Sequence, residues 1–343
     1  MLSKDGPYAY AKACGIIGKS FLGKIISSLS GLSSLSEFER LIFPEQHQEL
    51  SGGELLADLE SRIVKKTVRQ ILTIVNSFGN PPELIVRMLK TYEYSDLKAC
   101  LQHIVCGKKE PPKISNIGRF GTVHFDAFPD LNAMLRNTEF RFLLSRDLKS
   151  IKVGMDVVPV ETKIDALYYD GLIKSLRQLS AEDKQIAQKI LADEISLRNC
   201  TWALRLRNYF HKTAGETVND LMDIKLRDQT GGKKSSLTAA AEESVGFSLD
   251  SRPAWNGWKW ENFLNPEEAS VHWVADPRHF QNSASGYLYR LAEKSFHRAP
   301  ASVSSVFCFI KLRQFEEDLL TSIAEGLALG IESAEVFKML GAA

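Results

Sequence analysis

Apolar residues recur every three or four positions through most of the chain, which is the spacing of one buried face of an α-helix. The clearest stripe, with lysines and arginines on the opposite side, runs through Leu55, Leu59, Ile63, Val68, Leu72 and Val75. Ser51 and Glu54, just before it, have the spacing of a capping box. A second stripe predicts one helix from Pro7 to Leu29, although three glycines lower the helix propensity there.

Strand signals are weak by comparison. Apolar and polar residues alternate only in short stretches, near 121–125 and 153–160, and neither stretch has an evident pairing partner. The hydrophobic pattern therefore predicts an all-α fold.

Two interruptions divide the helical pattern. Residues 108–121 are rich in proline, glycine and charge, and residues 228–236 (DQTGGKKSS) form a stronger break. A chain of 343 residues also exceeds the usual size of a single hydrophobic core. These observations predict three helical domains, at 1–112, 113–228 and 229–343.

Each predicted domain contains an acidic residue at a similar place on an expected long helix, namely Glu93, Glu194 and Glu316. Four residues earlier stand Leu89, Ile190 and Leu312, and thirteen or fourteen residues earlier stand the candidate N-caps Asn80, Ser180 and Ser302. Matches of this kind also arise by chance on amphipathic helices. The recurrence favours an internal three-fold repeat without establishing one.

Composition narrows the class of function. Lys and Arg total 43 against 42 Asp and Glu, and this balance gives no basic excess for binding nucleic acid. No apolar run approaches the roughly 20 residues that cross a bilayer, and the first residues lack the layout of a signal peptide. The five cysteines are scattered, so we expect free, mostly buried thiols rather than disulfides. We expect a soluble protein that reaches a membrane only through a partner.

Motifs for catalysis, cofactors or metals are not evident. The GGKKSS sequence has Arg227 where a phosphate-binding loop needs its leading glycine, and Lys234 where it needs a hydroxyl residue. The seven histidines lack the spacing of metal ligands. Adjacent acids such as Glu316 and Glu317 point about 100° apart on a helix, so we interpret most such pairs as solvated surface. We predict no catalytic, cofactor or metal site.

Two further segments contain residues with potential roles. The tryptophans Trp255, Trp258, Trp260 and Trp273 indicate a core first and a protein interface as the alternative, with base stacking the least favoured. The segment 197–210 places Arg198, Arg205 and Arg207 among apolar residues. Arg198 follows Glu194 by four positions, so we expect these two to pair within the chain, with an acidic partner as the alternative.

Several segments, in the correct order from residue 8 to 340, resemble one family. They are YAYAKACGIIGKSFLG (8–23) with the following LIFP (41–44), YEYSDLKACL (92–101), EISLRNCTWALRLRNYF (194–210) and KLRQFEEDLLTSIAEGLALGIESAEVFKML (311–340). The chain is similar to the C subunit of V/A-type ATPases, which is called d in eukaryotic vacuolar enzymes.

The resemblance implies three similar helical domains around a pseudo-three-fold axis, shaped like a funnel. It also implies a non-catalytic connector between the central-stalk subunits and the membrane proteolipid ring, in a machine that moves protons or sodium ions. Such a protein sits at the cytoplasmic face of the membrane through the ATPase complex and needs no cofactor or nucleic acid. Candidate partner-interface residues are Arg205, Arg207, Trp258 and Glu316. A generic α-helical scaffold or adaptor is the alternative.

Overall fold

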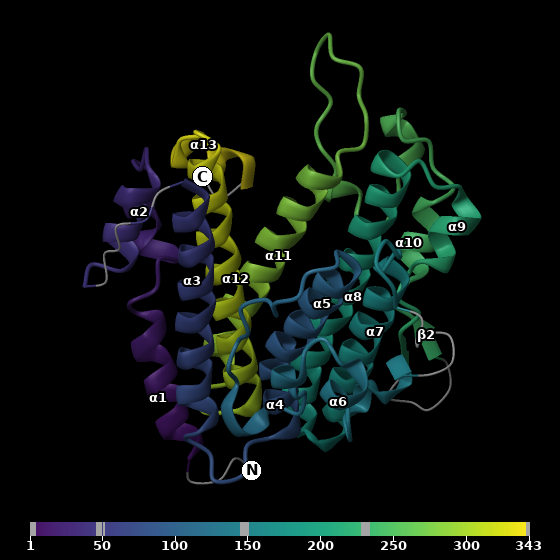
Figure 1. Cartoon of the computed structure of the whole chain (residues 1–343). Helices are drawn as coiled ribbons and strands as arrows, with labels where there is room; N and C mark the ends of the chain where they lie inside the picture. Colours follow the sequence, from purple (N-terminus) through teal and green to yellow (C-terminus); the bar gives the residue numbers. More distant parts are fainter. Residues whose placement is uncertain (1–4, 46–49, 51, 145–150, 228–233, 341–343) are drawn as a thin grey trace.

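The computed structural model describes residues 5–45, 50, 52–144, 151–227 and 234–340. These residues form an assembly of helices with one short hairpin (Figure 1). The α-helices are α1 (Gly6–Ile17), α2 (Leu35–Ile42), α3 (Gly52–Val75), α4 (Glu83–Leu89), α5 (Thr91–Val105), α6 (Leu131–Met134), α7 (Val158–Ser175), α8 (Ala181–Tyr209), α9 (Ala214–Asn219), α10 (Ala239–Ser244), α11 (Pro277–Arg298), α12 (Val303–Ala328) and α13 (Ser333–Leu340). The all-α prediction is confirmed.

The longest helices begin where local chemistry favours a start. The Ser180 hydroxyl accepts a hydrogen bond from the Asp183 N–H at the start of α8, and Ser302 accepts one from Ser305 at the start of α12. Both predicted N-caps are confirmed. The third is wrong, because Pro82 and not Asn80 occupies the N-cap position of α4. The predicted Ser51 cap of α3 lies outside the described residues.

The N-terminal stripe does not form one helix from Pro7 to Leu29. Helix α1 ends at Ile17, and a separate 3₁₀ segment covers Gly23–Leu29. Gly18 weakens the helix at this point, and Ser20 leaves the helical path to donate a hydrogen bond to the Glu316 carboxylate. The helix therefore ends early, and the chain that follows it contacts α12 instead.

Neither predicted extended piece is a strand. Residues 121–125 lead into a 3₁₀ turn (Phe125–Ala127), and 153–160 runs into the start of α7. The described strands are β1 (Lys225–Arg227) and β2 (Lys234–Ser236), which pair antiparallel on either side of residues 228–233. The predicted break at 228–236 overlaps this hairpin, since β2 lies within the break. The connection at 108–121 contains no α-helix, as expected.

Helix α12 is central to the molecule (Figure 1). It contacts α1, α2, α3, α4, α8, α11 and α13, and every side chain from Val306 to Ile310 is buried. A single large hydrophobic cluster draws residues from α1, α3, α4, α5, α7, α8, α11 and α12. Because this core contains residues from all three predicted domains, it joins segments far apart in sequence. The boundaries at 112 and 228 stay a prediction.

Two smaller clusters complete the core. One surrounds the four tryptophans and packs on α8 and α11. The other joins α2, the first half of α3, the end of α12 and α13, and is reinforced by Ser333, which exchanges hydrogen bonds of 2.9 and 3.1 Å with the backbone of Leu32. This contact holds the segment before α2 against the start of α13. Among the described residues, no helix combines the length and apolar character that crossing a membrane requires.

Candidate functional site

Six helices, α3, α5, α7, α8, α11 and α12, surround a cavity of about 1350 Å³. Side-chain contacts show how the helices in its walls run relative to one another. Lys98 and Gln102 of α5 meet Asp165 and Glu161 of α7, so these helices are antiparallel. The cavity is lined by residues from the first part of α7 (158–169) and α11 (281–288) and from the second half of α8 (194–205). It therefore lies toward the end where α8 finishes and α7 and α11 begin, which we call the mouth (top of Figure 1).

An ion pair between α8 and α12 lies deep in this cavity. The Lys311 Nζ is 2.7 Å from Glu194 Oε2, and the Tyr169 hydroxyl donates to Glu194 Oε1 at 2.8 Å. Burial alone raises the pKa of Glu194, but the charges of Lys311 and Arg198 and the hydrogen bonds from Lys311 and Tyr169 outweigh it and lower that pKa. Glu194 is thus a stable carboxylate that joins three helices.

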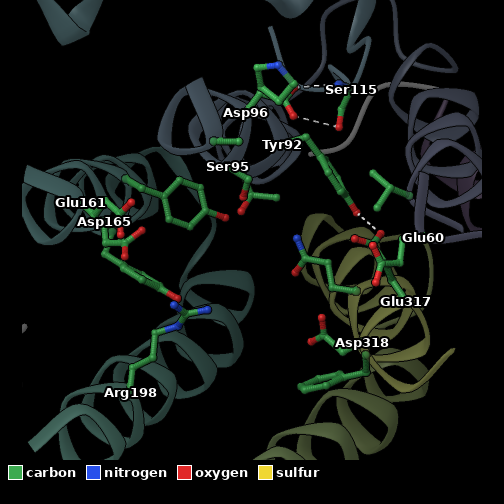
Figure 2. Close-up of a pocket in the computed structure, with 18 of the residues that line it drawn as sticks. Glu60, Tyr92, Ser95, Asp96, Ser115, Glu161, Asp165, Arg198, Glu317 and Asp318 are labelled. Atoms are coloured by element: carbon green, nitrogen blue, oxygen red, sulfur yellow. Dashed lines mark hydrogen bonds between the residues drawn. The ribbon is translucent and has the colours of Figure 1, made fainter. Parts of the chain in front are cut away.

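Arg198 does not make the ion pair with Glu194 that its spacing predicts. The Lys311 ammonium occupies the position next to that carboxylate. The Arg198 guanidinium lies 5.8 Å from the centroid of the Tyr169 ring and extends into the cavity (Figure 2). The prediction of this pair is wrong, because an i, i+4 spacing carries no information about a lysine that arrives from another helix.

Acidic side chains dominate the remaining walls (Figure 2). Glu60, Glu317 and Asp318 come from α3 and α12, whereas Asp96, Glu161 and Asp165 come from α5 and α7. Burial raises the pKa of Glu317 to about 7, although the Tyr92 hydroxyl donates to it at 2.9 Å. Burial likewise raises the pKa of Asp96 to about 7, against hydrogen bonds from the backbone and hydroxyl of Ser115. These carboxyls are held in surroundings that disfavour their charge.

The four predicted partner-interface residues do not come together on one surface. Arg205 lines the cavity near the mouth and hydrogen-bonds Gln281 of α11. Arg207 donates to the carbonyls of Ser244, the last residue of α10, and of Phe247 just after it. Trp258 is buried, and Glu316 is buried with Arg313 and Ser20 around it. Their role in partner binding stays a prediction.

The tryptophan cluster is core, as predicted. Trp255, Trp258, Trp260 and Trp273 are all buried, and each indole N–H donates to an oxygen of the chain, at 2.8 to 3.0 Å. Satisfied indoles and packed rings together form the hydrophobic centre of the segment that precedes α11.

The three recurring acids all have partners inside the chain. Glu93 accepts hydrogen bonds from the backbone of Thr122 and Val123, and Glu194 and Glu316 pair with Lys311 and Arg313. The first acid is not on one long helix with Leu89, since α4 ends there and α5 begins at Thr91. All three acids thus have partners inside the chain. The recurrence fails at Glu93, which is not on the same helix as Leu89.

The acidic lining of the cavity was missed from the sequence. The interpretation of most adjacent acid pairs as solvated surface does not apply to Glu316 and Glu317. Glu316 is buried against Ser20, whereas Glu317 turns into the cavity toward Tyr92. The one usable signal was their place in an otherwise apolar helix. Among the described residues no group of histidines, cysteines and acids is arranged to hold a metal ion. Three of the five free cysteines are buried, in line with the expectation.

Comparisons with known proteins agree with the resemblance in sequence. The sequence model of the family described as ATP synthase (C/AC39) subunit matches residues 24–338. An uncharacterized protein of Treponema pallidum is 24% identical over 330 residues, covering 94% of this chain and 92% of that protein. The C subunit of the A-type ATP synthase of Haloferax volcanii is 22% identical over 294 residues, covering 82% and 80%. That of Methanococcoides burtonii is 22% identical over 209 residues, covering 57% and 56%.

Proposed function

The chain belongs to the ATP synthase (C/AC39) subunit family, and from this premise we propose that it is the non-catalytic central-stalk connector of a rotary V/A-type ATPase. In this role it joins the rotor shaft to the proteolipid ring and transmits torque for proton or sodium transport. It is held at the cytoplasmic face of the membrane through the complex. The observation that carries the proposal is the partly open cavity lined by six helices.

The size of the cavity suits a helical end. A helix is about 10 Å across and rises about 1.5 Å per residue, so about 1350 Å³ accommodates roughly ten residues. The three predicted domains would then surround the cavity about a pseudo-three-fold axis. The expected funnel would consist of the mouth and the cavity below it. The opposite end, where α11 turns into α12, would face the polar loops of the ring.

Stiffness between the walls supports a role in transmitting force. The Lys311–Glu194 pair links α12 to α8, and the hydrogen bond from Tyr92 to Glu317 links α5 to α12. The densely packed core around α12 resists deformation because close-packed interiors have low compressibility. Of the candidate interface residues, Arg205 is best placed to touch an entering shaft because it lines the cavity. A generic adaptor is the weaker alternative, since the family match covers nearly the whole chain.

Filling the cavity tests the proposal. Ser95 on α5 and Ser285 on α11 line it and are exposed to it, so Ser95→Trp and Ser285→Trp should occupy the space without disturbing the core. Native mass spectrometry of complexes purified from membranes through a tag on this chain should show the stalk subunits and the ring with wild type. Both variants should lose the stalk subunits and keep the ring.

Ser36→Trp is the matched control, because Ser36 is exposed on α2, outside the cavity lining. It should retain both groups of partners. Stalk subunits retained by the two cavity variants at the wild-type level would contradict docking in the cavity.

A further inference from the structure

Four carboxyls of the cavity combine a raised pKa with the lack of an ion pair among the described residues. Among the described residues Asp165 pairs with Lys98 and Glu161 accepts from Gln102, but Glu60, Asp96, Glu317 and Asp318 have no lysine or arginine within ion-pair distance. Burial is the largest influence on all four and raises the pKa of each. Of the four, Asp96 is buried, Glu60 and Glu317 are partly buried, and Asp318 is exposed to the cavity. A cation brought from outside would stabilise the charged form of each.

Arg198 is in the complementary situation on the facing wall. Its side chain is exposed, and the guanidinium points into the cavity (Figure 2). Its described contact is with the face of the Tyr169 ring, and no carboxylate of the described residues lies within ion-pair distance. Arginine offers five N–H donors in a planar fork, so a guanidinium that faces the cavity without an ion-pair partner among the described residues is a ready site for a carboxylate or for carbonyl oxygens.

The other cations of the lining form no ion pair with the four acids, although the charge of Lys113 acts to lower the pKa of Glu60 and the charges of Arg198 and Lys311 act to lower that of Asp318. Lys311 is held by Glu194 and Arg205 by Gln281. Lys113 donates to the Ala57 carbonyl. His103 and Lys108 lie at the end of α5, toward the mouth, which leaves Lys65 on α3 as a further exposed cation. The four acids therefore lie on α3, α5 and α12, with Lys65 also on α3, and the Arg198 guanidinium faces the cavity from α8.

We propose that the cavity recognises its occupant by a two-sided charge pattern, in which Glu317 and Asp318 take lysine or arginine side chains and Arg198 takes an acidic group. This inference rests on the proposed function and specifies the partner, namely a helical end of the shaft with basic residues on one flank and an acidic residue or the chain's own carboxylate on the other. Pairs formed on two walls fix the rotational setting of that helix. A torque coupler needs a fixed rotational setting because a helix without specific contacts to the cavity walls would rotate freely instead of transmitting torque.

Binding of the soluble central-stalk subunits to the purified chain, measured by calorimetry in low and high salt, tests the pattern. The double variant Glu317→Gln with Asp318→Asn should weaken binding by about tenfold or more, as loss of buried charge pairs does. Arg198→Met should weaken it similarly, and Arg198→Lys should recover part of the loss. The wild-type affinity should fall with salt, and that of the variants should fall less.

Two matched changes outside the cavity are the controls. Glu242→Gln with Glu243→Gln neutralises an adjacent acid pair on α10, and Lys174→Met removes an exposed cation on α7. Both should bind within about threefold of wild type. Thermal unfolding of each variant shows whether it is folded. If Arg198→Met does not fold, the binding of Arg198→Lys tests the role of Arg198 instead.

The outcomes separate the two proposals. Wild-type binding with every cavity charge variant within threefold of it would overturn the charge pattern and leave the connector role standing. Absence of wild-type binding would overturn docking in the cavity as well.

Discussion

Lys311 and Glu194, which are 117 positions apart in the chain, form an ion pair of 2.7 Å between α12 and α8 inside the cavity. The side chains are 7% and 13% exposed, so water does little to screen the pair. Because α8 and α12 both line the cavity, this contact holds two of its walls together. The integrity of the cavity should depend on it.

Removing the cation should destabilise the fold. Lys311→Met leaves a largely buried carboxylate with only Arg198 and Tyr169 nearby, and we expect a loss of about 2–3 kcal/mol in the free energy of unfolding. Urea denaturation measures this. Lys174→Met, which breaks an exposed pair with Asp170, should change stability by less than about 0.5 kcal/mol. An equal effect of the two substitutions would contradict a structural role for the internal pair.

The same pair predicts that its contribution to the stability of the fold is lost at low pH. The pKa of Glu194 is lowered in the folded state, so its contribution is present above the ordinary carboxyl pKa and is lost as the pH falls through the lower, folded value. The stability difference between wild type and Glu194→Gln should therefore shrink as the pH is reduced below about 4. Denaturation curves at several acidic pH values follow it, and a constant difference would speak against a depressed pKa.

Glu317 should behave in the opposite sense. Its folded pKa is about 7, above the ordinary value, so the folded state binds more protons and loses stability as the pH rises through 7. Glu317→Gln removes this penalty. After allowance for solvent in the cavity, its stability relative to wild type should increase by about 1–2 kcal/mol between pH 5 and pH 8. Urea midpoints at the two pH values give the change, and a relative stability that falls with pH would refute the raised pKa.

Close packing at Gly326 should limit substitution there. A Cβ at this position of α12 would overlap the Val336 Cγ2 on α13. Gly326→Ala should therefore cost about 1–2 kcal/mol, even though alanine favours the helix. The double variant Gly326→Ala with Val336→Ala should recover part of the cost, relative to the sum of the single changes. Strict additivity in thermal unfolding would mean that the two positions are not in contact.

Trp258 shows how much of the fold was predictable. A tryptophan-rich segment predicts a core, and the ring is indeed buried with its indole N–H donating to the Ala240 carbonyl. The caps Ser180 and Ser302 were likewise predictable, since capping depends on residues within three positions. Features of this kind depend only on residues that are close together in the sequence, so the sequence can predict them.

The cavity was not predictable in the same way. Its contacts join residues that are far apart, such as Tyr92 and Glu317, and no periodicity specifies which helices will face each other. Glu194 illustrates the limit. Its nearest sequence neighbour of opposite charge is Arg198, but the tertiary fold brings Lys311 closer and sends Arg198 into the open space.

Coupling in the complete machine tests the central claim most directly. ATP-driven ion uptake and ATP hydrolysis are measured together in membrane vesicles from cells with and without this chain. A connector predicts that uptake is lost without the chain, that hydrolysis continues in heads released from the membrane, and that adding back the wild-type chain restores both attachment and uptake. ATP-driven ion uptake that persists at the wild-type rate in its absence would contradict the account.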